Sequence, residues 1–151
     1  MSRLILFLLG ILFLASQSAS ADDGTEILGV WTTTDDKSKV EIFQQNEKLK
    51  GKIISLKEPN WPANDEKGMG GKPKNDRNNP DPNLRDKPII GLEFMSGFIY
   101  SGKKRWDGGK IYDPENGKTY KCKMTLVSTN RLDVRGFIGI SLIGRTEVWT
   151  R

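Results

Sequence analysis

Apolar and polar residues alternate along most of the chain after residue 21. The alternation has a period of two, as in a strand with one buried face and one face in water. It is clearest over residues 40–43, 49–53, 120–126 and 132–135. Further strands fit residues 30–34, 89–95, 98–101, 110–112 and 145–150. No stretch after residue 21 has helical periodicity, so the pattern predicts an all-β fold.

Short turn sequences separate these stretches. Asn46-Glu47 connects two of them, and Ser128-Thr129-Asn130 connects another two. Residues 113–117, Asp-Pro-Glu-Asn-Gly, predict a tight hairpin, because Pro presets one corner and Asn-Gly accepts positive φ. Hairpins between neighbouring strands predict an antiparallel meander of about eight to ten strands, which closes into a barrel to remove its edges.

Residues 57–88 interrupt the alternation. They hold six of the seven prolines, together with Gly68, Gly70 and Gly71. Such a segment is too polar and too rich in strand breakers for the sheet, and it predicts a long loop over one barrel mouth. Trp61 is the residue that a disordered linker would be least expected to carry, so it is a candidate ligand contact.

The N-terminus has the pattern of a cleavable signal peptide over residues 1–21. Arg3 supplies the positive charge, an apolar run follows, and Ala19-Ser20-Ala21 predicts cleavage before Asp22. The apolar run is shorter than the roughly 20 residues that cross a bilayer, which disfavours the alternative of a retained anchor. We expect residues 22–151 to form one domain in the periplasm or outside the cell, and not an integral membrane protein.

The charge pattern predicts no nucleic-acid partner. The chain has 24 Lys and Arg against 19 Asp and Glu, with the two signs interspersed. Lys48, Lys50 and Lys52 lie on one face of a predicted strand, where a solvated sheet surface explains them better than a basic stripe for nucleic acid.

The chain has no histidine and one cysteine, Cys122. These two facts disfavour serine or cysteine triads and most zinc sites. Cys122 shares a strand face with Met124 and Leu126, which predicts an inert buried thiol. Four oxygen donors, Asp76, Asn78, Asn79 and Asp81, suggest calcium, but Pro80 interrupts the required spacing and turns explain them better. We expect no metal and no cofactor.

Gly29-Val30-Trp31 begins the first predicted strand, and Arg145, Trp149 and Arg151 belong to the last. In a closed barrel these strands are neighbours, so a Trp can plug one end while an Arg stacks on its ring. The arrangement resembles the glycine-x-tryptophan and late-arginine signature of lipocalins and related calycin barrels. A core Trp in a β-sandwich is the alternative.

A longer set of residues resembles the bacterial exported family known as domain of unknown function 2147. The set comprises Asn79-Pro80-Asp81, Leu84-Arg85, Pro88, Gly91-Leu92, Trp106, Gly108-Gly109, Ile111-Tyr112-Asp113-Pro114, Asn116-Gly117-Lys118, Tyr120, Leu132, Arg135-Gly136, Gly144-Arg145-Thr146 and Trp149-Thr150-Arg151. The resemblance implies a periplasmic barrel like those of lipocalins or fatty-acid-binding proteins, and it implies no activity. The chain departs from the family in a longer, Gly- and Lys-rich insertion between Glu58 and Asp76.

The candidate ligand contacts are aromatic: Trp61, Tyr100, Trp106, Tyr112 and Tyr120. Aromatic bodies with polar tips suit an amphiphilic ligand, although core or hairpin packing explains them equally well. We therefore expect a non-enzymatic protein that binds a small apolar or amphiphilic molecule in the barrel interior.

Two other function classes stay open. One is an envelope interaction protein with a filled barrel, docking partners through residues 57–88 and the aromatic rim. The other, ranked last, is a hydrolase using two of the carboxylates Asp107, Asp113 and Glu115. The sequence leaves the oligomeric state open.

Overall fold

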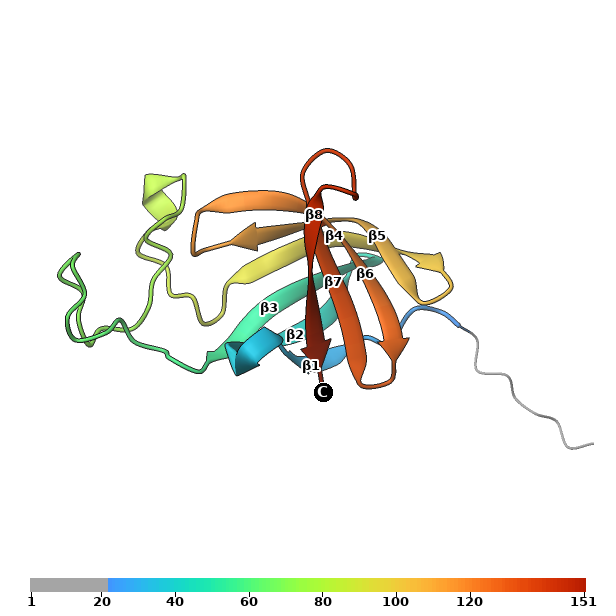
Figure 1. Cartoon of the computed structure of the whole chain (residues 1–151), viewed down its shortest axis with the longest axis horizontal. Coiled ribbons are helices and arrows are strands. Elements are labelled where there is room, and N and C mark those ends of the chain that lie inside the picture. The colour runs from blue at the N-terminus through green and yellow to red at the C-terminus, as the bar shows by residue number, and fades with distance from the viewer. Residues whose placement is uncertain (1–21) are drawn as a thin grey trace, which may run out of the picture.

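The computed structural model describes residues 22–151, so the predicted signal peptide lies outside the described residues. Eight antiparallel strands follow one another around a closed barrel, each paired with its neighbours in sequence (Figure 1). The strands are β1 (Gly29–Thr32), β2 (Ser38–Gln45), β3 (Lys48–Leu56), β4 (Glu93–Gly102), β5 (Arg105–Asp113), β6 (Lys118–Ser128), β7 (Arg131–Phe137) and β8 (Gly144–Thr150). The predicted all-β closed meander is confirmed.

Some predicted strand boundaries were wrong. The expected strands 89–95 and 98–101 are one strand, β4, which begins only at Glu93. Residues 89–92 form a turn instead, with Gly91 at a φ of 95°. The first strand ends at Thr32, because Thr34–Asp36 turns into the short 3₁₀ helix η1.

The first and last strands join to close the barrel, as expected. Their ladder is short, with Thr32 opposite Thr150 as its one residue pair. The Thr34 hydroxyl adds a bond across the same seam, donating to the Val148 carbonyl at 3.1 Å. By contrast, β7 and β8 pair over seven residues.

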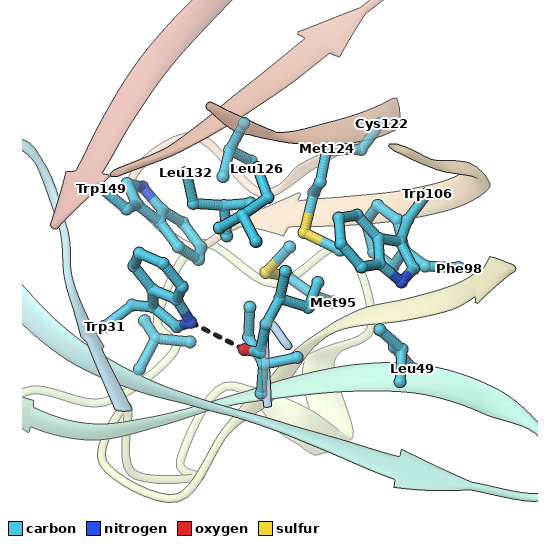
Figure 2. Packing of buried hydrophobic residues seen from close by; sticks show 14 residues of the cluster. Trp31, Leu49, Met95, Phe98, Trp106, Cys122, Met124, Leu126, Leu132 and Trp149 are labelled. Carbon is cyan, nitrogen blue, oxygen red and sulfur yellow. Dashed lines mark hydrogen bonds between the residues drawn. The ribbon is translucent and has the colours of Figure 1, made fainter. Parts of the chain in front are cut away.

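Side chains fill the barrel interior. Figure 2 shows Trp31 and Trp149 at one side of the core and Trp106 with Phe98 at the other, while Met95 and Met124 lie between. The wall is shaped for this filling at Gly109, where an added Cβ would lie only 2.3 Å from the Phe98 ring. Because side chains fill the interior, a ligand could enter the core only if they rearranged.

The two barrel ends differ. At the first, which we call the sealed end, tight turns at residues 46–47, 103–104 and 129–130 meet the segment that precedes β1. At the second, the open end, lie η1, the long segment between β3 and β4, the 114–117 turn and the β7–β8 connection. In Figure 1 the long segment extends to the left of the barrel, and the β7–β8 connection rises at the top.

Candidate functional site

The segment before β1 closes the sealed end. Two core indoles donate to its carbonyls: Trp31 Nε1 to Ile27 at 2.8 Å, and Trp106 Nε1 to Gly24 at 3.2 Å. The Tyr100 ring packs beside Trp106, with 5.2 Å between centroids. Because both buried indole N–H groups are satisfied here, the end is closed by specific bonds as well as by apolar contact.

An arginine closes the same end of the barrel. The Arg151 guanidinium lies 4.2 Å from the Trp31 ring centroid and donates to the carbonyls of Glu26 and Leu28. The other late arginine, Arg145, is the second residue of β8, at the open end, and takes no part in this stack, since its exposed side chain is paired with Glu147 at 3.7 Å.

The five aromatic candidates do not form one site. Trp106 is fully buried and lies with Tyr100 at the sealed end. Tyr112 and Tyr120 flank the β5–β6 turn at the open end, with Ile111 opposite Tyr120. Trp61 belongs to the long segment. The structure therefore brings together Tyr100 and Trp106, whereas Tyr112 and Tyr120 lie on opposite faces of the β5–β6 hairpin.

Tyr112 anchors the long segment to the β5–β6 hairpin. Its hydroxyl donates to the buried Asp76 carboxylate at 2.7 Å, and Asn79 Nδ2 donates to the other oxygen at 2.7 Å. Burial raises the pKa of Tyr112 above its usual value, and the Asp76 hydrogen bond raises the same pKa further. Asn78 Nδ2 also donates to the Pro114 carbonyl. The segment is thus tied to the hairpin by a buried polar network.

The same network accounts for the oxygens that suggested calcium. Asp76 accepts the two bonds just described, and Asn79 Oδ1 accepts from the Asp81 backbone N–H. The Asp81 carboxylate in turn caps the 3₁₀ helix η2 (Pro82–Leu84) by accepting from Asn83. The bonds within residues 76–83 are turn and cap bonds, whereas the bond from Tyr112 to Asp76 joins distant parts of the chain.

Trp61 organises the long segment from within. The Arg77 guanidinium stacks 3.4 Å from its ring centroid, and the indole Nε1 donates to Asn75 Oδ1 at 3.1 Å. Arg77 also pairs with Asp65 at 2.8 Å, and this bond lowers the pKa of the Asp65 carboxyl. The segment therefore has its own small aromatic and ionic centre.

Two of the three acidic candidates, Asp113 and Asp107, are engaged in local bonds. Asp113 accepts from the Glu115 backbone N–H and from Asn116 Nδ2, which is the bonding of an ordinary turn. Asp107 accepts from the Ser101 hydroxyl. Cys122 is buried, and burial raises the pKa of its thiol to about 12, with the charge of Glu147 as a smaller cause.

A second group of residues forms a mouth at the open end, and of these the sequence singled out only Tyr120 as a candidate ligand contact. Phe94 and Ile111 are only partly buried while packing against the core. The Phe94 ring lies 6.2 Å from the Trp149 ring. An added Cβ on Gly136 would meet only Ile111 and Tyr120, at 3.7 and 3.8 Å, so a small space lies between these two side chains.

Trp149, whose ring lies beside Phe94, has an unused hydrogen-bond donor. Its Nε1 is buried and has no hydrogen-bond partner within residues 22–151. Figure 2 shows this nitrogen at the margin of the core, on the side away from Trp106. An unpaired buried donor costs about 1–3 kcal/mol, which a ligand acceptor group could recover.

Surface hollows also lie at both ends of the described barrel. A shallow groove of about 420 Å³ lies where β1, β2 and β3 reach the open end. It is lined by Thr32, Asp36, Ser38, Lys39, Ser55, Leu56 and Lys57. A hollow of about 60 Å³ lies beside Tyr100 and Trp106 at the sealed end, which is too small for an organic ligand.

Comparison with known proteins agrees with this architecture. The family model described as "Uncharacterized protein conserved in bacteria (DUF2147)" matches residues 29–151. The chain belongs to this family. Among solved structures, this DUF2147 member is similar to a protein of the human pathogen Helicobacter pylori that is described as belonging to the lipocalin family. The two are 30% identical with a TM-score of 0.69, over 82% of this chain and 81% of the other.

The comparison with curated proteins found no match to this DUF2147 member. Within residues 22–151, no helix has the length and apolar character needed to cross a bilayer.

Proposed function

We propose that the protein is exported by way of residues 1–21 and binds a small amphiphilic molecule in the mouth at its open end. The observation that carries this proposal is the buried, unpaired Nε1–H of Trp149 beside the half-buried Phe94 ring. An apolar wall with one unmatched donor suits a ligand that has an apolar body and one acceptor group.

The two ends of the barrel direct the ligand to this mouth. The sealed end is closed by hydrogen bonds from Trp31 and Trp106 and by the Arg151 clamp. The filled core below Phe94 limits how deep a guest can reach. The proposed site is therefore shallower than the interior cavity expected from the sequence, and it takes a small molecule or the tip of a longer one.

Similarity to a lipocalin-family structure supports a binding role and a non-enzymatic one. The chemistry near the mouth agrees. Burial raises the pKa of Cys122 to about 12, which keeps the thiol protonated and a poor nucleophile. Asp113 is engaged in turn bonds.

The binding proposal is tested with cis-parinaric acid, a fluorescent fatty acid, titrated into the purified protein. Gly136→Val should fill the space between Ile111 and Tyr120 and weaken binding of the probe about tenfold or more. Trp149→Phe removes the donor and should weaken it about fivefold, the equivalent of one ordinary hydrogen bond. Val127→Ala, on the outer face near the sealed end, is the matched control and should bind normally. Equal binding by all four proteins, or no binding by the wild type, contradicts the proposal.

Export is tested separately by sequencing the N-terminus of the protein recovered from its native cells. We expect Asp22 as the first residue. A protein that keeps residues 1–21 and stays in the cytoplasm would contradict export while leaving the binding site untouched.

A second candidate function, a partner-docking module, is favoured by the filled interior and by the ordered long segment. Replacing residues 60–87 by a short Gly-Ser linker should abolish cross-linking to an envelope partner, while parinaric acid binding survives. Loss of probe binding with retained cross-links would be the opposite result and would exclude this candidate.

A further inference from the structure

The connection between β7 and β8 is the most apolar turn of the described barrel. Its aliphatic side chains are exposed: Ile138 by 67%, Ile140 by 60%, Leu142 by 84% and Ile143 by 66%. The other hairpins turn with polar residues, such as Asn46-Glu47, Lys103-Lys104 and Thr129-Asn130. Four clustered aliphatic side chains at one tip are a surface that water disfavours. We call residues 138–143 the apolar tip.

Part of the backbone of the apolar tip is paired within the protein. The Ile138 N–H donates to the Ile143 carbonyl at 3.2 Å, and the Ile143 N–H donates to the Ile140 carbonyl at 3.1 Å. From below, Arg135 Nε donates to the Ser141 carbonyl at 2.7 Å. These backbone groups are thus paired within the protein, while the aliphatic side chains project outward. Such pairing lowers the cost of bringing the tip into an apolar medium, where unpaired backbone groups are costly.

Positive charge lies next to the tip, on the outer barrel wall. Lys110 stands opposite Lys121 across β5 and β6, and Lys123 stands opposite Arg135 across β6 and β7. Lys121 also faces Phe137, the residue that leads into the tip. Like charges directly opposite one another destabilise a sheet. No salt bridge within residues 22–151 includes any of these four cations, so the protein itself does not neutralise them.

From this juxtaposition we infer that the apolar tip inserts into the surface of a bilayer containing anionic phospholipids, with the adjacent cations on the headgroups. Aliphatic side chains that enter the acyl boundary and lysines that meet anionic headgroups are the two parts of an interfacial anchor. A second copy of the chain fits the tip less well, because its own unneutralised cations would approach the same charges. The tip and the mouth lie at the same end of the barrel, so docking would turn the mouth toward lipid (Figure 1).

The test is flotation of the protein with vesicles of phosphatidylcholine alone or mixed with phosphatidylglycerol. All variants are purified in the same processed form as the wild type, so residues 1–21 contribute equally or not at all. Wild type should float with the mixed vesicles and much less with phosphatidylcholine. Leu142→Ser with Ile143→Ser should weaken binding about tenfold or more, because apolar burial is lost. Lys121→Gln with Lys123→Gln should weaken it about fivefold per charge and abolish the preference for phosphatidylglycerol.

A matched control keeps the test specific. Ile99→Ser with Val127→Ser also removes two exposed aliphatic side chains, but from the outer walls of β4 and β6, and it should float like the wild type. Thermal unfolding of each variant verifies that the barrel is intact. Gly136→Val should also float normally, so that a failure of the mouth proposal and a failure of this one give different results.

Three outcomes would overturn the inference. The first is equal flotation with and without phosphatidylglycerol. The second is unchanged binding by the Leu142→Ser, Ile143→Ser variant. The third is that the wild type forms a dimer, detected by light scattering, that the Leu142→Ser, Ile143→Ser variant does not form, while neither protein binds vesicles. That last outcome would assign the tip to contact between two copies.

Discussion

Gly109 is the position where the filled interior can be tested most directly. Its missing side chain makes room for Phe98, because an added Cβ would lie 2.3 Å from the nearest ring atom. Gly109 does not have the positive φ that strains other residues, so alanine costs nothing in backbone conformation. Gly109→Ala should destabilise the protein by about 1–3 kcal/mol, the usual cost of overpacking a core.

A double-mutant cycle identifies Phe98 as the cause. Phe98→Ala alone should cost about 3–5 kcal/mol through lost burial and the cavity left behind. In the double variant the alanine methyl at 109 occupies part of that cavity. The combined loss should therefore be smaller than the sum of the single losses by about 1–3 kcal/mol. Urea unfolding, followed by tryptophan fluorescence, measures each free energy of unfolding.

Gly136 provides the matched control, since it is also a barrel glycine without positive φ. An added Cβ there would meet Ile111 and Tyr120 only at 3.7 and 3.8 Å, which is ordinary contact. Gly136→Ala should therefore be neutral or stabilising by up to about 1 kcal/mol. If Gly109→Ala is as mild as Gly136→Ala, and additive with Phe98→Ala, the interior has free space and the reasoning for a shallow mouth fails.

Three further predictions concern other parts of the barrel. Arg151→Ala should cost about 1–2 kcal/mol in urea unfolding through loss of the Trp31 stack and its carbonyl bonds, whereas Arg145→Ala should change stability by less than about 0.5 kcal/mol. The pKa of Tyr112 is raised in the fold, so its bond to Asp76 stabilises fully below about pH 10, its unfolded value, and is lost as the pH rises through the folded pKa. Tyr112→Phe should therefore flatten the loss of stability measured between neutral and strongly alkaline pH, and an unchanged alkaline profile would contradict this account. The Cys122 thiol should resist a disulfide reagent at pH 8 until urea unfolds the protein, because burial raises its pKa to about 12; fast labelling of the folded protein would show that the thiol is exposed.

The sequence predicted the architecture well wherever the information is local. On β6, Cys122, Met124 and Leu126 face the core, as the alternation indicated. The Asp-Pro-Glu-Asn-Gly turn connects β5 and β6 at the expected place. Trp31 and Arg151 stack, because barrel closure makes the ends of the chain neighbours whatever the details of the strands.

The mouth could not be predicted, because it depends on non-local geometry. Phe94 would point outward by simple alternation from the buried Met95. A register shift where β3 meets β4, between Gly51 and Lys52, turns it toward Trp149. No pattern within either strand indicates that bulge.

The assignment of aromatic residues to the two barrel ends failed for a related reason. Trp106 lies at the start of β5, at the sealed end, and it is buried there because the chain near Gly24 folds over it. That covering segment is irregular and carries no periodic signal. The apolar tip was also missed, since Ile138 and Ile140 alternate with small residues as in a strand. The turn is evident only from the backbone bonds among Ile138, Ile140 and Ile143 and from the Arg135 bond to Ser141.

The short ladder between β1 and β8 gives the barrel a preferred line of opening. Every other pair of adjacent strands has a longer ladder. Between β1 and β8, only the Thr32–Thr150 pair and the hydrogen bond from Thr34 connect the strands. Amide protons of β8 that face β1 should therefore exchange with solvent by small local excursions, without global unfolding. Such local opening would give the filled barrel transient volume beside Trp149, which is the volume that the proposed ligand site needs for a molecule larger than its resting shape admits.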